Sequence, residues 1–173
     1  MDQAGLRARQ APLKERYRLD PEAARSASRA EARLVPGEVA CRVVTHGGEI
    51  QAGLHPATGG DGSEACSGDM LLEALVACAG VTLSAVAIAS GVTFRAARVI
   101  AEGSWDARGT LGIDRAAPVG IKDIALRFEV DTDADDRTLA RLIETTERYC
   151  VVFQTLRQPP ALSCTYHRSG EGA

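Results

Sequence analysis

The sequence has no excess of basic charge, and it is almost without lysine. Lys14 and Lys122 are the only lysines among 173 residues, arginine carries the remaining positive charge, and the formal net charge is −3. A chain with this balance lacks the strongly basic surface that nucleic-acid binding requires, so we expect no nucleic-acid partner. Apolar residues make up 45% of the sequence and charged residues 25%, which is typical of a globular domain rather than a disordered or fibrous chain.

Motifs for several common kinds of site are missing as well. The sequence contains no phosphate loop, no dinucleotide fingerprint and no Ser–His–Asp arrangement. Its five cysteines are odd in number and irregularly spaced, which argues against a secreted disulfide framework and against a metal site of the C-x-x-C kind. The first sixteen residues include no apolar segment of the kind found in a secretory signal. We therefore expect a cytoplasmic protein that uses no metal or cofactor and keeps its cysteines as thiols or redox-active groups.

Residues 74–94 form the one long uncharged segment, and it is long enough to span a bilayer. It is rich in Ala, Ser, Thr and Gly, which contribute little free energy of transfer into lipid. We therefore interpret it as the buried helix of a globular protein and expect no membrane partner. Asp69 or Ser67 is the expected N-cap of this helix, and Gly91 is the residue expected to end it.

The other segments predict an α+β fold in a single domain. We expect a frayed start over residues 1–10, followed by short helical segments at 12–17 and from Asp20. A second long helix opens at residues 133–136. Strands are expected at residues 39–43, 49–54, 93–106, 120–131 and 161–168, with a hairpin turn at 46–48. A helix that is apolar on all sides needs cover on all sides, which one small sheet cannot provide, so the pattern favours a homodimer.

The cysteines can all be interpreted as packing residues. Cys41 and Cys164 lie on the apolar faces of expected strands, and Cys66 lies in a glycine-rich loop where we expect the greatest exposure. Cys78 lies within the uncharged helix, and Cys150 closes the apolar stripe of the second helix. Both thiols are expected to face the core, where a disulfide is possible but not required. The residues alone leave open whether the two form a catalytic pair or inert core thiols.

Two segments carry a resemblance to the OsmC/Ohr family. SGDMLLEALVACAGVTLSAVAIASGV closely resembles the first-cysteine helix of this family, and LIETTERYCVVFQTL resembles its second-cysteine segment. The similarity covers residues 27–166, so residues 1–26 are interpreted as an N-terminal extension and residues 27–173 as the OsmC-like domain. The resemblance implies antiparallel sheets wrapped around a buried central helix in an intertwined homodimer.

The resemblance also implies an activity, that of a thiol-dependent peroxidase which reduces organic hydroperoxides and is itself reduced by an external dithiol. In this sequence Cys78 matches the peroxidatic cysteine and Cys150 the resolving cysteine. Val151 follows, at a position where many members have proline. Cys66, close to the start of the first helix, is a possible competing resolving thiol. The alternative is a non-enzymatic dimer of the same fold that binds a ligand or senses redox state.

An uncharged helix offers no cation to stabilise a Cys78 thiolate, and a free thiol has a pKa of ~8.5. In the family, an arginine held by a glutamate serves this purpose. Asp69, nine residues before Cys78, stands where many members carry that glutamate; nine helical steps would place it on the opposite face, so it could act only from a pre-helix turn. Arg33 lies nearest to the position of the family arginine, with Arg42 and Arg29 as rivals.

Overall fold

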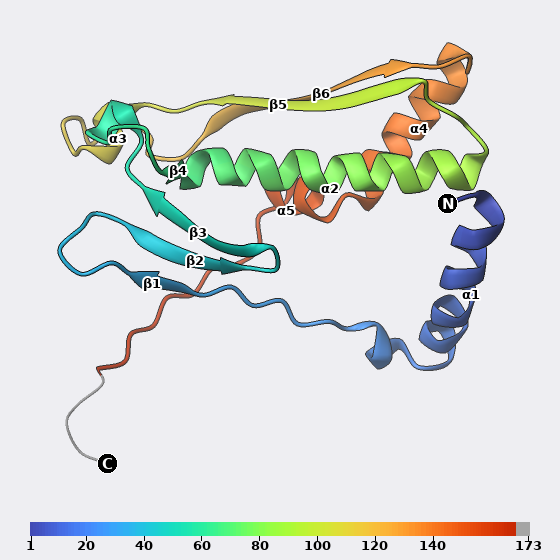
Figure 1. Ribbon diagram of the computed structural model, residues 1–173, viewed down its shortest axis with the longest axis horizontal. Coiled ribbons are helices and arrows are strands. Elements are labelled where there is room, and N and C mark those ends of the chain that lie inside the picture. The colour runs from blue at the N-terminus through green and yellow to red at the C-terminus, as the bar shows by residue number, and fades with distance from the viewer. Residues whose placement is uncertain (169–173) are drawn as a thin grey trace.

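The computed structural model describes residues 1–168, which form a two-sheet α+β structure around one long helix (Figure 1). The elements follow the expected segregation of strands and helices. In chain order they are α1 (Gln3–Leu19), η1 (Pro21–Ala24), β1 (Ala32–Leu34), β2 (Cys41–Thr45), β3 (Gly48–Gly53), η2 (Pro56–Thr58), β4 (Ala65–Cys66), α2 (Ser67–Ser90), β5 (Ala96–Ser104), α3 (Ala107–Thr110), β6 (Lys122–Asp131), α4 (Asp136–Tyr149) and α5 (Val151–Arg157).

The two sheets differ in their strand order and pairing. The first has the order β1-β2-β3-β4, with a β2–β3 hairpin that turns at His46-Gly47 and with β4 parallel to β3. The second is a long antiparallel β5–β6 hairpin with a register shift between Glu102 and Ser104. In β6 every second residue from Ile124 to Val130 is half-buried, as expected for a strand with one face on the core.

Helix α2 is the centre of the protomer. It runs along the β5–β6 hairpin, with α4 and α5 packed beside it (Figure 1). The residues it buries recur every fourth position, from Leu75 through Ala79 and Leu83 to Ala87, and so form one stripe. Gly91 ends the helix in the left-handed conformation (φ 70°), which confirms the predicted C-terminus. The predicted N-cap was wrong, because Cys66 holds that position and Ser67 and Asp69 belong to the first turn.

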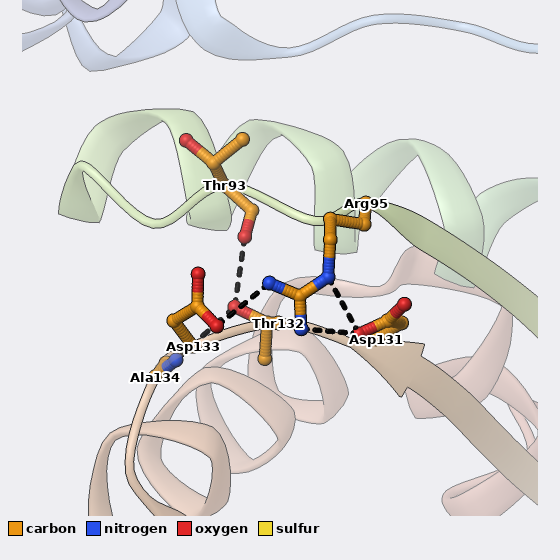
Figure 2. Close-up of polar contacts among 6 residues, drawn as sticks. All are labelled: Thr93, Arg95, Asp131, Thr132, Asp133 and Ala134. Carbon is orange, nitrogen blue, oxygen red and sulfur yellow. Dashed lines mark hydrogen bonds and ion pairs between the residues drawn. The ribbon is translucent and has the colours of Figure 1, made fainter.

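A polar cluster joins the start of β5 to the end of β6 (Figure 2). The Arg95 guanidinium donates to Asp131 at 2.9 Å and to Asp133 at 2.7 Å, and the Thr132 hydroxyl donates to the carbonyl of Thr93 at 2.8 Å. The carboxylates are more than half exposed, so each ion pair contributes at most about 1 kcal/mol. The cluster fixes the chain just before α4 and therefore helps to position the N-terminal end of that helix.

The amino-terminal segment is more ordered than the sequence predicted. The expectation of a frayed segment over residues 1–10 was wrong, because α1 begins at Gln3 and continues through Pro12. The Asp2 side chain caps the helix by accepting from the N–H of Gly5 at 2.8 Å, and the Gln3 amide donates to the carbonyl of Ala89 at 2.7 Å. This second bond ties α1 to the C-terminal end of α2. The expected helix at Asp20 is the single turn η1.

The predicted last strand, residues 161–168, is absent from the described protomer. The segment pairs with no strand there, and Leu162 and Tyr166 are 92% and 95% exposed. Cys164 is exposed as well, so its expected burial was wrong. An alternating sequence forms a strand only where it meets a free sheet edge, and the segment after Pro159-Pro160 pairs with neither sheet in the described residues.

By length and composition alone, α2 could cross a membrane, with a mean hydropathy of 2.1 over its most apolar window. The core helix of a globular protein passes the same test, and this one packs against a sheet and two helices. Yet only 22% of that window is buried within the protomer. A large apolar face of α2 is therefore left uncovered.

Candidate functional site

Cys78 lies on the edge of the uncovered face of α2. It shares that face with Leu71, Ala74 and Val81 at spacings of three and four residues. Val81 is 73% exposed, whereas Cys78 is half-buried because its other side packs against the core cluster of Leu75, Ala79 and Cys150. The Cys78 thiol is therefore both anchored in the core and close to the surface.

Cys150 lies at the junction of α4 and α5, where it is fully buried against Cys78. It ends α4 in an extended conformation (φ −73°, ψ 108°) and is also the N-cap of α5. Leu142 and Thr146, which precede it on the same stripe, are buried too, so the predicted core face of this helix is confirmed. Both thiols are free, and the predicted meeting of Cys78 with Cys150 is observed.

The surroundings of Cys78 favour its thiolate. Partial burial acts to raise the pKa of Cys78, but hydrogen bonds from the backbone N–H of Val152, the Cys150 thiol and the backbone N–H of Val151 outweigh it, and the pKa lies below its ordinary value. Thr82 also contributes, but its hydroxyl already donates to the Cys78 carbonyl at 2.7 Å. The two backbone groups belong to the first turn of α5, where N–H groups have no acceptor within the helix.

The contact between the two thiols has the opposite effect on Cys150, whose pKa it raises. Burial raises the pKa of Cys150, and the negative charge of a Cys78 thiolate raises it further, although the N–H of Phe153 opposes this. The raised pKa of Cys150 favours its protonated form, which donates a hydrogen bond to the Cys78 sulfur. Of the two thiols, Cys78 is therefore the one that ionises more readily.

Within the protomer, Arg33 and Asp69 are not among the groups that shift the pKa of Cys78. Arg33 lies on β1, is 71% exposed and pairs with Glu31 at 3.4 Å. Asp69 is exposed in the first turn of α2, so continuous helix separates it from Cys78 and places it on the opposite face. Neither residue therefore reaches the thiol pair from its own chain.

The remaining cysteines are remote from the pair. Cys66, the N-cap of α2, lies twelve residues before Cys78, a rise of ~18 Å, so the two cannot form a disulfide within one chain. Cys66 was also expected to be the most exposed cysteine, but it is half-buried, and Cys164 is the exposed one. Cys41 is half-buried on β2.

Sequence reasoning missed the donors that act on Cys78. Val151 and Val152 act through backbone N–H groups, which no side-chain pattern reveals. The one available signal was Val151 itself, because a residue other than proline after Cys150 retains an N–H at the helix start. The turn forms with valine in this position and presents Cys150 to Cys78.

The geometry defines a small α+β protein with a dithiol centre between its central helix and its last two helices. A family model described as OsmC-like protein matches residues 60–165, more than half of the chain. This chain therefore belongs to the OsmC-like family. No curated protein matches the sequence.

Solved structures of this family share the fold. An OsmC-like protein from Mycoplasma pneumoniae aligns with a TM-score of 0.64 at 19% identity, covering 78% of this chain and 89% of that one. An organic hydroperoxide resistance protein from Legionella pneumophila aligns with a TM-score of 0.59 at 17% identity, covering 78% and 93%. That from Bacillus subtilis aligns with a TM-score of 0.52 at 16% identity, again covering 78% and 93%.

Proposed function

We propose that this protein is a thiol-dependent peroxidase that reduces organic hydroperoxides through Cys78 and Cys150. The observation that carries the proposal is the asymmetric thiol pair, in which the pKa of Cys78 is lowered and that of Cys150 raised. A nucleophile that ionises readily beside a protonated partner is the arrangement that two-step peroxide reduction needs. The names of the Legionella and Bacillus proteins, organic hydroperoxide resistance proteins, support the same substrate class.

In the first step the Cys78 thiolate attacks the terminal oxygen of the hydroperoxide. The S–O bond forms as the O–O bond breaks, so that Cys78 becomes a sulfenic acid and the alkoxide leaves, taking up a proton to become an alcohol. The apolar side chains beside Cys78 on α2, Ala74 among them, suit the hydrocarbon part of such a substrate, which would lie where the second copy proposed below meets this helix.

In the second step Cys150 attacks the sulfenic sulfur, giving a Cys78–Cys150 disulfide and water. Oxidation of Cys78 removes the negative charge that raises the pKa of Cys150, so the second thiol ionises more readily once it is needed. An external dithiol then reduces the disulfide by exchange. The cycle uses no metal or cofactor, and we place it in the cytoplasm, where dithiol reductants maintain free thiols.

A single turnover in the Cys150→Ser variant tests this assignment. Without the resolving thiol, the Cys78 sulfenic acid should accumulate to about one per subunit and be trapped by dimedone, because no neighbouring sulfur can displace its oxygen. Mass spectrometry of the Cys78 peptide measures the adduct, and Cys164→Ser is the control that should still form the disulfide. A disulfide formed by Cys150→Ser, or an absence of adduct, would show that the roles are assigned wrongly.

We further propose that the protein is an intertwined homodimer whose second copy covers α2. The face with Leu71, Cys78 and Val81 is uncovered, and the β1–β3 part of the first sheet stands away from this helix, joined to it through β4 (Figure 1). Leu34 and Val39, from the same part of the chain, are 84% and 73% exposed. A second copy could also supply a cation, so Arg33 of the partner subunit, oriented by Asp69, stays our proposal for an additional contact to Cys78.

Replacing Val81 by glutamate should dissociate this dimer. The substitution places a charge at the centre of the proposed interface, where burying an unpaired carboxylate is strongly unfavourable. Light scattering at micromolar concentration should show a dimer for the parent protein and a smaller species for Val81→Glu. Ile113→Glu is the matched control, because Ile113 is similarly exposed, at 71% against 73%, but lies outside α2. A well-folded monomeric parent protein would contradict the proposal.

A further inference from the structure

A cavity remote from the thiol pair lies where the N-terminal end of α2 meets the loops after β3 and β5. Its volume is about 220 Å³. Its walls include Leu54, His55, Trp105 and Ile121, with Ser67 at the start of α2. Cys78 is eleven helical residues beyond Ser67, a rise of ~16 Å, and neither Cys78 nor Cys150 lines the cavity. The cavity is therefore separate from the proposed peroxide site.

The walls of the cavity are held in place. The rings of His55 and Trp105 pack edge to face with their centroids 5.1 Å apart. His55 is fixed further because its Nδ1 accepts from the N–H of Ala57 at 3.0 Å. Ile121 packs closely on Gly103, where an added Cβ would come within 2.6 Å of its side chain. A pocket with ordered walls can bind a ligand without the free-energy cost of rearranging them.

The lining specifies the chemistry of a ligand. Among the residues that the structure describes, no acidic side chain, lysine or arginine lines the cavity, so a charged ligand would find no charged partner there. Leu54, Val119 and Ile121 offer apolar contacts, and Trp105 offers an aromatic surface. Because Nδ1 of His55 accepts a hydrogen bond, its Nε2 is the ring atom left to donate, and the lining also includes the hydroxyl of Ser67.

The volume sets the size of the ligand. An apolar cavity of about 150 Å³ holds a benzene molecule. About 220 Å³ therefore accommodates one six-membered ring with one or two further heavy atoms. We propose that the cavity is a second binding site, which takes a small uncharged aromatic molecule bearing one oxygen that accepts a hydrogen bond. This site is independent of the proposed peroxidase activity.

Benzyl alcohol is a probe of this class, and Trp105 reports on it because it is the only tryptophan in the chain. Titration of the reduced protein should give a saturable change in Trp105 fluorescence. Toluene, which lacks the oxygen, and benzoate, which carries a charge, should each bind about tenfold more weakly or worse. A fluorescence change that stays linear up to the solubility limit of benzyl alcohol, or equal binding of benzoate, would overturn the proposal.

Two substitutions at Gly68 provide the matched comparison. A Cβ there lies 3.6 Å from both Cys66 Sγ and Ile121 Cδ1, so Gly68→Ala fits and should keep binding, whereas Gly68→Leu extends into the cavity and should abolish it. Both replacements favour the helical conformation, so α2 should be retained. As a second readout, benzyl alcohol should slow alkylation of Cys66, which lines the cavity, without affecting the exposed Cys164. Unchanged binding by Gly68→Leu, or no protection of Cys66, would refute the site.

Discussion

Replacing Cys78 by serine should abolish consumption of organic hydroperoxide, with a loss of at least about a thousandfold in rate. A serine hydroxyl in this position is neutral at physiological pH and is not oxidised by peroxides, so neither the attack nor the sulfenic acid is available. The side chains are nearly the same size, and Cys78 is only half-buried, so the fold should be unchanged. Following hydroperoxide loss in the presence of an excess of dithiol measures the effect.

Cys66→Ser and Cys41→Ser are suitable controls for this result. Both cysteines are half-buried, like Cys78, but neither belongs to the core cluster that contains the thiol pair. Each variant should retain the activity of the parent protein. Activity of Cys78→Ser equal to that of the parent would rule out Cys78 as the nucleophile.

Replacing Val151 by proline should raise the pKa of Cys78 and slow the reaction at neutral pH. The change removes one of the two backbone N–H groups that stabilise the thiolate. A hydrogen bond to a charged group contributes about 1.5–3 kcal/mol, and hydrogen bonds to sulfur lie at the weak end, so we expect a rise of about one pKa unit. The thiolate fraction then falls about tenfold, while greater intrinsic nucleophilicity recovers part of this, leaving a rate loss of about three- to tenfold.

The backbone accepts this substitution without rearrangement. Proline is favoured at the first position of a helix, and Cys150 before it already has the extended conformation that a residue preceding proline requires. The Val151 side chain is 71% exposed, so Val151→Ala is a control that keeps the N–H and should behave as the parent protein.

The pH dependence of Cys78 ionisation shows in which direction Val151→Pro shifts the pKa of this thiol. Thiolate absorbance of Cys78, measured in proteins without the other four cysteines, should rise with pH through a midpoint below the ordinary thiol value. In that background Cys150 no longer contributes its hydrogen bond, so the comparison isolates the backbone donors. The midpoint should move to higher pH only in Val151→Pro. A midpoint above ~8.5 in the protein with Val151 would instead favour an inert thiol and a non-enzymatic role.

The parts of the fold that were predicted correctly depend on local patterns. Gly91 ends α2 because only a left-handed residue fits there, and the stripe that ends in Cys150 follows from helical periodicity. The proximity of the two cysteines followed from two apolar helix faces that had to pack together. The resemblance of the two cysteine segments to one family agreed with this placement.

The predictions that were wrong concern segments whose structure depends on interaction partners that sequence patterns do not identify. Residues 161–168 alternate like a strand, but they pair with no strand in the part of the chain that the structure describes. The start of α1 was missed because Asp2 was not recognised as its cap. The donors to Cys78 are backbone groups supplied by a helix start 73 residues away in sequence, so the search for a charged side chain pointed elsewhere.

The most direct test is a stopped-flow titration of the fully reduced protein with tert-butyl hydroperoxide or a fatty-acid hydroperoxide, counting the thiols consumed. The proposed mechanism predicts that two thiols are lost for each hydroperoxide reduced, and that peptide mapping finds a Cys78–Cys150 disulfide. Cys78→Ser should lose none. Reduced protein that leaves the hydroperoxide intact, or that oxidises at Cys66 or Cys164 while Cys78 and Cys150 stay free, would contradict it.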